Sequence, residues 1–324
     1  MVGTAQHVRR VRDRYLDHLS DFMGYVYLCL LAFRPMFTLA IAKNAFYSQF
    51  IPVSVGTAFD NTGLPYNLSA VVSNNVFDET MYEQYSPMFL PITYAVSYGA
   101  IFAMYPAVVV HTFLWYRHDI VRQFRRSLND EADIHSRLMR RYRDVPRWWF
   151  AAFGAGCVVL GIISIEICKT GLPIWAFFLA LIFVTVFVLP FGIIQAITNQ
   201  QFFLSVLAEV LIGYALPGRP VASMLFKTLC SDSVAQAAAY CSDLKFGHYM
   251  KIPPRLTFTS QIVASTVTVI AGVVAQQWAL DNIPDICSPD QKSFFTCPNL
   301  KLFTTASIIW GGIGPRRLFS FGAL

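Results

Sequence analysis

The sequence has little charge for its length, and it lacks the short motifs of several enzyme classes. Only 14% of its 324 residues are charged, whereas about 25% is usual for a soluble globular domain. Its seven cysteines include no Cys-x-x-Cys pair, and no arrangement of residues matches a metal site, a serine or cysteine triad, or a phosphate-binding loop. We therefore expect neither an enzyme nor a protein with a cofactor or a bound metal.

Apolar residues take the place of the missing charge. They make up 55% of the sequence, and the mean hydropathy is +0.48, which is more apolar surface than the core of a soluble protein needs. From Met88 onward, apolar runs recur that are about 20 residues long, the length of a membrane-spanning helix. We predict an all-α, polytopic transmembrane helical bundle with about seven spans, at residues 88–116, 148–168, 172–198, 201–216, 221–240, 256–280 and 300–314.

The net charge of +6 is concentrated in one segment. Nine arginines and only five acidic residues lie between Arg117 and Arg147. Because the flanking segments are apolar and of membrane length, the positive-inside rule predicts a cytoplasmic loop here, rather than a surface for nucleic acid. The short segments 201–216 and 221–240 form either a tight pair of spans or a re-entrant hairpin, and in both cases the chain returns to the cytoplasmic side at Asp243.

Two features are expected on the opposite, outer side of the membrane. Cys287 and Cys297 lie in a polar, proline-containing loop and are a disulfide candidate if that loop faces an oxidising compartment. Asn67 begins an Asn-Leu-Ser sequon and is a glycosylation candidate. Both positions fit the topology that the arginines predict.

A group of amides is the first candidate for a substrate site. Phe191, Gln195 and Asn199 are spaced to lie near one face of a helix, and Gln200 follows at a potential helix end. An aromatic ring beside amide donors and acceptors could hold a peptide backbone. The alternative is that these amides only bond one helix to another.

Two acidic residues inside apolar segments are candidates for proton coupling. Glu209 lies nine residues before Gly218, and Lys227 lies nine residues after it. If the two segments pack antiparallel, the charges reach a similar depth and can pair. The pair is then either a structural ion pair or a proton carrier, with Asp232 as the other intramembrane candidate.

Several segments of the chain resemble the oligopeptide transporter family. The segment ending in Lys251-Ile252-Pro253-Pro254-Arg255 is similar to a long signature of that family, and the shorter motifs match in order. These segments are residues 59–63, 196–201, 218–222, 243–255, 296–299 and 308–317.

This resemblance implies proton-coupled import of tetrapeptides and pentapeptides, or of glutathione, across the plasma membrane. Its peptide-transporting branch fits better than its metal-chelate branch. Within residues 243–255, the expected inner-face gate or brace comprises Asp243, Lys245, Tyr249, Lys251, Pro253, Pro254 and Arg255, with the two prolines fixing the chain and the basic residues at the lipid headgroups.

The resemblance covers residues 44–317, and not residues 1–43 or the tail 318–324. Members of the family are about twice as long, and their N-terminal motif Asn-Pro-Gly-Pro-Phe-Asn is absent here, so we expect a piece of a transporter. Because transporter sites commonly form between repeats, the missing half or a full-length relative is an expected partner. The rival interpretations are a metal-chelate transporter and a non-transporting remnant or accessory subunit.

Overall fold

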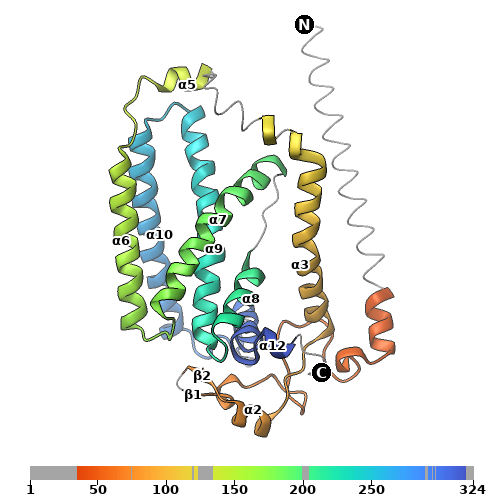
Figure 1. Cartoon of the computed structure of the whole chain (residues 1–324). Coiled ribbons are helices and arrows are strands. Elements are labelled where there is room, and N and C mark those ends of the chain that lie inside the picture. The colour runs from red at the N-terminus through yellow and green to blue at the C-terminus, as the bar shows by residue number, and fades with distance from the viewer. Residues whose placement is uncertain are drawn as a thin grey trace. The chain divides into compact units, whose positions relative to one another are not determined.

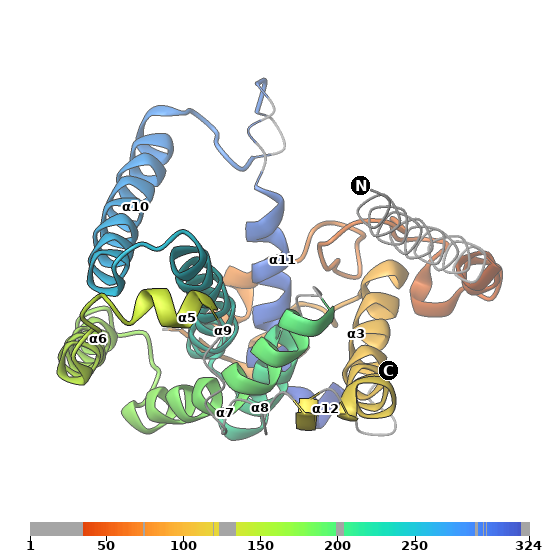
Figure 2. The same cartoon turned by 90° about the horizontal axis from the view of Figure 1, so that it is seen from above.

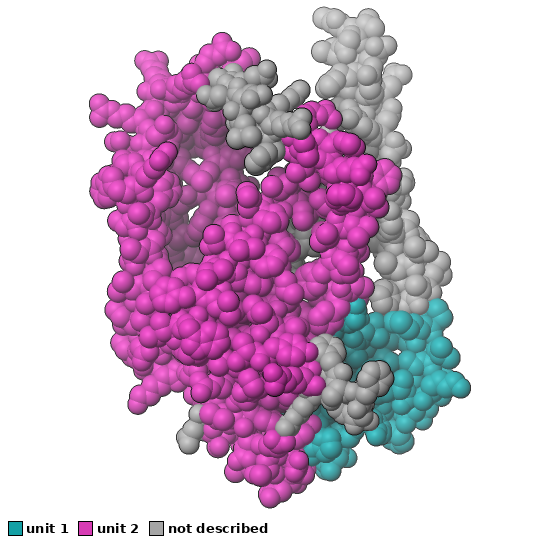
Figure 3. Space-filling view, in the orientation of Figure 1, with its two compact units in different colours: residues 1–66, 86–99 teal, residues 67–85, 100–324 magenta. Residues whose placement is uncertain are grey.

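The computed structural model is almost entirely helical (Figure 1). It describes residues 35–73, 75–118, 120–122, 134–198, 204–288, 291–293, 295 and 297–318. The chain divides into two compact units, coloured separately in Figure 3: residues 1–66 with 86–99, and residues 67–85 with 100–324. The boundary at residue 99 falls inside the helix α3 (Ile92–His111).

In the first unit, the described residues form a helix at residues 35–42, the short helix η1 (Ala45–Tyr47), the start of α3, and a set of short turns around Asp60. The buried Asp60 carboxylate accepts hydrogen bonds from the backbone N–H groups of Thr62 and Leu64, at 2.8 and 3.0 Å, and from the Thr62 hydroxyl. Gly63 has a φ of +78°, which suits glycine at this tight turn. The motif at residues 59–63 therefore builds a turn that its own side chains stabilise.

The second unit contains the remaining helices. It also contains a small antiparallel hairpin, β1 (Val72–Ser73) with β2 (Val76–Phe77), which lies between the first two of these helices in the chain. The helical elements are η2 (Leu68–Ala70), α2 (Glu79–Tyr85), η3 (Thr112–Tyr116), α5 (Ile134–Met139), α6 (Arg147–Ile167), α7 (Ile174–Thr198), α8 (Ser205–Ala215), α9 (Pro220–Tyr249), α10 (Pro254–Asn282), α11 (Pro298–Ala306), η4 (Ser307–Ile313) and α12 (Pro315–Leu318).

Within the described residues, four helices are long and apolar enough to cross a bilayer. They are Ile92–Tyr116, Arg147–Ile167, Ile174–Ala196 and Pro254–Asn282. The other three predicted spans are also helical: α8 is short, α9 is long but less apolar, and α11 continues into η4. Figure 1 shows α6, α8 and α10 running downward and α7 and α9 running upward, which is the alternation that the sequence predicts.

The core lies around α9, which packs against α7, α8 and η4. Seen from above, α9 is among α7, α8 and α11 (Figure 2). Phe226 of α9 and Ile212 of α8 are fully buried there. By contrast, α10 has no buried residue, and a Cβ atom on Gly154 or Gly156 of α6 would meet nothing within 4 Å. These apolar helices therefore keep most of their surface free of contacts within the described chain.

Helix α9 extends further than the apolar run predicts. The sequence suggests a span ending at Tyr240, whereas the helix continues to Tyr249. The segment between them, residues 241–248, has no proline and includes the good helix formers Leu244 and Lys245, so its polar side chains do not interrupt helical backbone geometry. The helix ends where Lys251 takes the left-handed conformation, with a φ of +62°.

The segment η4 packs unusually tightly against its neighbours. A Cβ atom on Gly311 would lie 2.6 Å from the Cα atom of Pro220, and one on Gly213 of α8 would lie 2.6 Å from the Trp310 carbonyl oxygen. Such contacts leave no room for a side chain. The glycines therefore let α8, α9 and η4 approach one another at backbone distance.

Candidate functional site

The structure brings Glu209 and Lys227 together between α8 and α9. The Lys227 Nζ atom lies 2.5 Å from Glu209 Oε1. Glu209 is 1% exposed and Lys227 is 20% exposed, so the pair has little contact with solvent. No other group among the described residues hydrogen-bonds this carboxylate. A buried carboxylate with a single partner is strongly dependent on that partner.

Two further side chains lie near this ion pair. The Lys227 ammonium is 5.5 Å from the centroid of the Phe303 ring, within the range of a cation–π contact. The phenol of Tyr105, on α3, interacts electrostatically with Glu209 and hydrogen-bonds the backbone of Leu207. A change in the charge of Glu209 would therefore alter the interactions of Lys227 on α9 and Tyr105 on α3. Through Lys227, it would also alter the contact with Phe303 on α11.

Asp232, the second acidic candidate, is in a different environment. It is exposed on α9, and the Ser231 hydroxyl donates a hydrogen bond to its Oδ1 atom at 3.1 Å. The two acidic candidates therefore differ in burial and in partner, which sequence hydropathy could not show. Glu209 is the more constrained of the two.

The predicted substrate residues lie only partly within the described chain. Phe191 and Gln195 are both on α7 and are partly buried, and Phe191 packs against the hydrophobic core. Asn199 and Gln200 lie outside the described residues. Their suggested contact with a peptide remains a prediction.

The predicted gate or brace residues occupy the turn between α9 and α10. Asp243, Lys245 and Tyr249 are exposed on the last turns of α9. Pro253 is the N-cap of α10 and Pro254 is its first residue, positions where the fixed backbone angle of proline suits a helix start.

This turn is connected to the segment before α6. The Arg255 Nε–H donates a hydrogen bond to the Asp144 carbonyl at 3.1 Å, and its guanidinium lies 5.9 Å from the Trp149 ring centroid. Lys251 Nζ lies 2.6 Å from Nδ1 of His135 on α5. Because an ammonium can only donate, His135 must accept through Nδ1. These contacts connect the α9–α10 turn to α5 and α6, and the role of the turn as a gate or brace remains a prediction.

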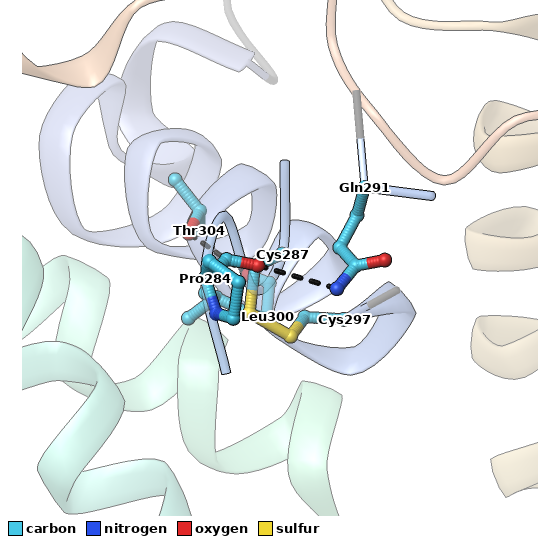
Figure 4. Close-up of a disulfide and its surroundings, with 6 residues drawn as sticks. All are labelled: Pro284, Cys287, Gln291, Cys297, Leu300 and Thr304. Carbon is cyan, nitrogen blue, oxygen red and sulfur yellow. Dashed lines mark hydrogen bonds between the residues drawn. A yellow bond between two sulfur atoms is a disulfide. The ribbon is translucent and has the colours of Figure 1, made fainter. Parts of the chain in front are cut away.

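The disulfide and glycosylation candidates are also placed. Cys287 and Cys297 are joined by a disulfide, and Gln291 Nε2 donates a hydrogen bond to the Pro284 carbonyl beside it (Figure 4). Asn67 is exposed, and its Oδ1 atom accepts a hydrogen bond from the backbone N–H of Ser69 at 3.1 Å. The compartment that each of them faces remains a prediction.

Two pockets that the sequence did not indicate lie near the loops at the lower end of the second unit in Figure 1. One, of about 540 Å³, lies between the hairpin segment 68–75, the start of α9 and the segment 303–307. The other, of about 340 Å³, is lined by residues of the α6–α7 and α8–α9 loops. Each combines residues from distant parts of the chain, so no local motif marks it.

A family model described as OPT oligopeptide transporter protein matches residues 28–323. The chain belongs to the oligopeptide transporter family. It is therefore an integral membrane protein of a transporter family, as the apolar helices indicate. The match extends beyond residues 44–317, where the sequence motifs were found.

Curated relatives agree with this family. The chain is 38% identical over 278 residues to the Sexual differentiation process protein isp4 of Schizosaccharomyces pombe, and 36% identical over 281 residues to Glutathione transporter 1 of the same yeast. It is 33% identical over 332 residues to Oligopeptide transporter 2 of Saccharomyces cerevisiae.

These matches cover 86%, 86% and 95% of this chain, but only 35%, 33% and 37% of the respective relatives. The chain thus spans about a third of the length of the curated relatives it matches. No solved structure matches it.

Proposed function

We propose that this chain takes part in moving small peptides, such as tetrapeptides, pentapeptides or glutathione, across the plasma membrane together with protons. Membership of a transporter family supports this function, as do relatives named for oligopeptide and glutathione transport. The observation that carries the proton step is the buried Glu209–Lys227 pair between two helices of the core.

The ion pair supplies a physical link between a proton and helix packing. When Glu209 is charged, its attraction to Lys227 holds α8 against α9. Protonation of Glu209 removes that attraction and leaves a largely buried ammonium without its counterion, which is unfavourable in a medium of low dielectric constant. A rearrangement of α8 and α9 that exposes the Lys227 ammonium to water would then lower the free energy. Tyr105 on α3 is the other titratable group that interacts with Glu209.

Uptake of a labelled tetrapeptide tests this proposal. Cells without peptide uptake of their own would express the chain, and accumulation would be followed at external pH 5.5 and 7.5. We expect greater uptake at the acidic pH. The Glu209→Gln variant should lose the pH dependence, whereas Asp232→Asn should keep it because Asp232 is exposed and has a neutral partner.

Surface labelling would show that each variant reaches the membrane in equal amount. Uptake no greater than in cells without the chain, despite normal amounts in the membrane, would contradict the transport function. Uptake with the same pH dependence in Glu209→Gln would instead contradict only the role of this residue.

A further inference from the structure

The larger of the two pockets is lined entirely by uncharged residues. Its lining is mainly apolar, with Met224 and Leu225 from α9 and Phe303 from α11. Hydroxyl groups and the amide of Asn75 complete it. Its volume of about 540 Å³ is in the range of small-ligand sites, and its chemistry suits a neutral ligand with an apolar side chain.

Hydrogen bonds hold the walls of this pocket in place. The Phe77 N–H of β2 donates to the Gly218 carbonyl in the α8–α9 loop at 2.9 Å. In the same loop, Arg219 Nη1 donates to the Gly171 carbonyl of the α6–α7 loop at 3.0 Å. Three segments that are distant in sequence are thus tied together, so the pocket is formed before a ligand arrives.

One polar group beside the pocket has no hydrogen-bond partner among the described residues. Thr170 lines the pocket, and its hydroxyl is buried and makes no hydrogen bond to any described residue. Leaving such a group unpaired is costly. A lipid acyl chain could not satisfy it, whereas the N–H or C=O group of a peptide bond could.

The smaller pocket has the opposite chemistry. Glu166, Lys169 and Arg219 supply charged groups to its lining. It adjoins the uncharged pocket at two places, because Lys169 precedes Thr170 and Arg219 precedes Pro220 in the chain. With two cationic side chains and one carboxylate, this lining carries a net positive charge. A net positive charge beside an uncharged pocket matches a peptide whose carboxylate lies next to an apolar side chain.

We propose that the two pockets form one recognition surface for a peptide's C-terminal end. Lys169 and Arg219 bind the terminal carboxylate, the uncharged pocket takes an apolar side chain, and Thr170 hydrogen-bonds the peptide group between them. Because the ring of Phe303 lies on this pocket and 5.5 Å from Lys227, occupancy is transmitted to the ion pair. This proposal rests on the proposed function and assigns a site that lies at the opposite end of α7 from Gln195.

A binding experiment separates this site from transport. The purified protein in lipid nanodiscs would be titrated with labelled Ala-Ala-Ala-Leu and with the same peptide carrying a C-terminal amide. We expect the amide to bind about tenfold more weakly, the size of a lost charge-assisted contact. In Lys169→Gln, the acid should bind more weakly than it binds the unmodified protein, and amidation should weaken binding by less than it does there, because only Arg219 still contacts the carboxylate.

Lys301→Gln is the matched control, since Lys301 is an exposed lysine on α11 that lines neither pocket. It should bind the acid and the amide as the unmodified protein does. Equal binding of acid and amide by the unmodified protein would overturn the carboxylate role. So would an undiminished preference for the acid in Lys169→Gln.

A second pair of variants tests the uncharged pocket. Val221 lines the pocket and is 41% exposed, so Val221→Trp can fill the space without repacking the core. It should weaken binding of Ala-Ala-Ala-Leu about tenfold but affect Ala-Ala-Ala-Ala much less. Thr170→Val should weaken both peptides by a similar factor.

Decanoate is the control ligand, because it carries a carboxylate and an alkyl chain but no peptide group. It should compete poorly, and Thr170→Val should not change its binding. Decanoate that competes as well as the peptide would overturn the proposal in favour of a lipid site. If these variants bind peptide normally while cells still take it up, the proposed site is wrong and the transport function stands. If the variants bind as predicted but cells take up no peptide, the site stands and the transport function is wrong.

Discussion

At the scale of single residues, close backbone contacts at glycine define the packing of η4. The Cα atom of Pro220 occupies the space that a side chain on Gly311 would need. Pro220 is also the first residue of α9 and lines the uncharged pocket. The sequence shows a Gly-Gly pair but not what it faces. Gly311 faces Pro220 and Gly312 faces Phe77, and both partners lie far earlier in the chain.

Replacing Gly311 by alanine should therefore destabilise the protein. The added Cβ atom would be forced against backbone rather than a flexible side chain, so we expect a loss of about 1–3 kcal/mol. Thermal unfolding of the purified protein in detergent measures it. Gly156→Ala on α6 is the control, because its Cβ atom meets nothing within 4 Å, and equal melting temperatures for the two variants would refute the packing argument.

The two acidic candidates, Glu209 and Asp232, show which properties of single residues can be predicted from the sequence. The spacing of Glu209 and Lys227 about Gly218 predicts their pairing, because two antiparallel segments bring equidistant residues together, and the structure places them in contact. The same reasoning could not rank Asp232, since its exposure depends on which side of α9 faces the core.

At the scale of elements, hydropathy predicts the long helices well and the helix ends poorly. Four predicted spans are long, apolar helices, since a bilayer-length apolar run leaves few other structures. Hydropathy missed the last part of α9, because residues 241–248 contain no proline to end the helix but are too polar to continue the apolar run. It also gave no indication of the π-helical geometry of η4, which depends on tertiary contacts.

The contact between the α9–α10 turn and the segment before α6 leads to a prediction about Arg255. Arg255→Gln removes the hydrogen bond to the Asp144 carbonyl and the contact with Trp149, together about 1 kcal/mol. This segment should then open more often, and limited trypsin digestion should cleave after Arg140 or Arg141 about fivefold faster.

Lys245→Gln provides the comparison, because Lys245 is an exposed basic residue near the same end of α9. Its cleavage rate should equal that of the unmodified protein. If Arg255→Gln were cleaved no faster than Lys245→Gln, Arg255 would not be part of a brace.

At the scale of the whole molecule, the loops of the second unit form two sets at opposite ends of the helices. The α6–α7 and α8–α9 loops lie at the lower end in Figure 1, whereas α5 and the α9–α10 turn lie at the upper end. The sequence predicts which loops group together, because membrane spans must alternate in direction. It could not predict the two pockets, whose walls come from four separate segments.

This arrangement predicts the side on which each loop is found. One variant would keep Cys287 as its only cysteine, with Cys297 and all the others replaced by serine. The free Cys287 thiol of this variant should react with a membrane-impermeant maleimide added to intact cells. Arg255→Cys in a cysteine-free background should react only after the cells are opened. Labelling of both positions, or of Arg255→Cys alone, in intact cells would show that the predicted topology is wrong.

Proton movement driven by peptide is the most direct test of the account. The protein would be reconstituted into vesicles containing a pH-sensitive dye, and a tetrapeptide would be added outside. We expect the interior to acidify with the unmodified protein and not with Glu209→Gln or with the uncharged pair Glu209→Gln/Lys227→Gln, while all three still bind peptide. Peptide accumulation in the vesicles without acidification, or acidification by Glu209→Gln equal to that of the unmodified protein, would contradict a proton step at the buried ion pair.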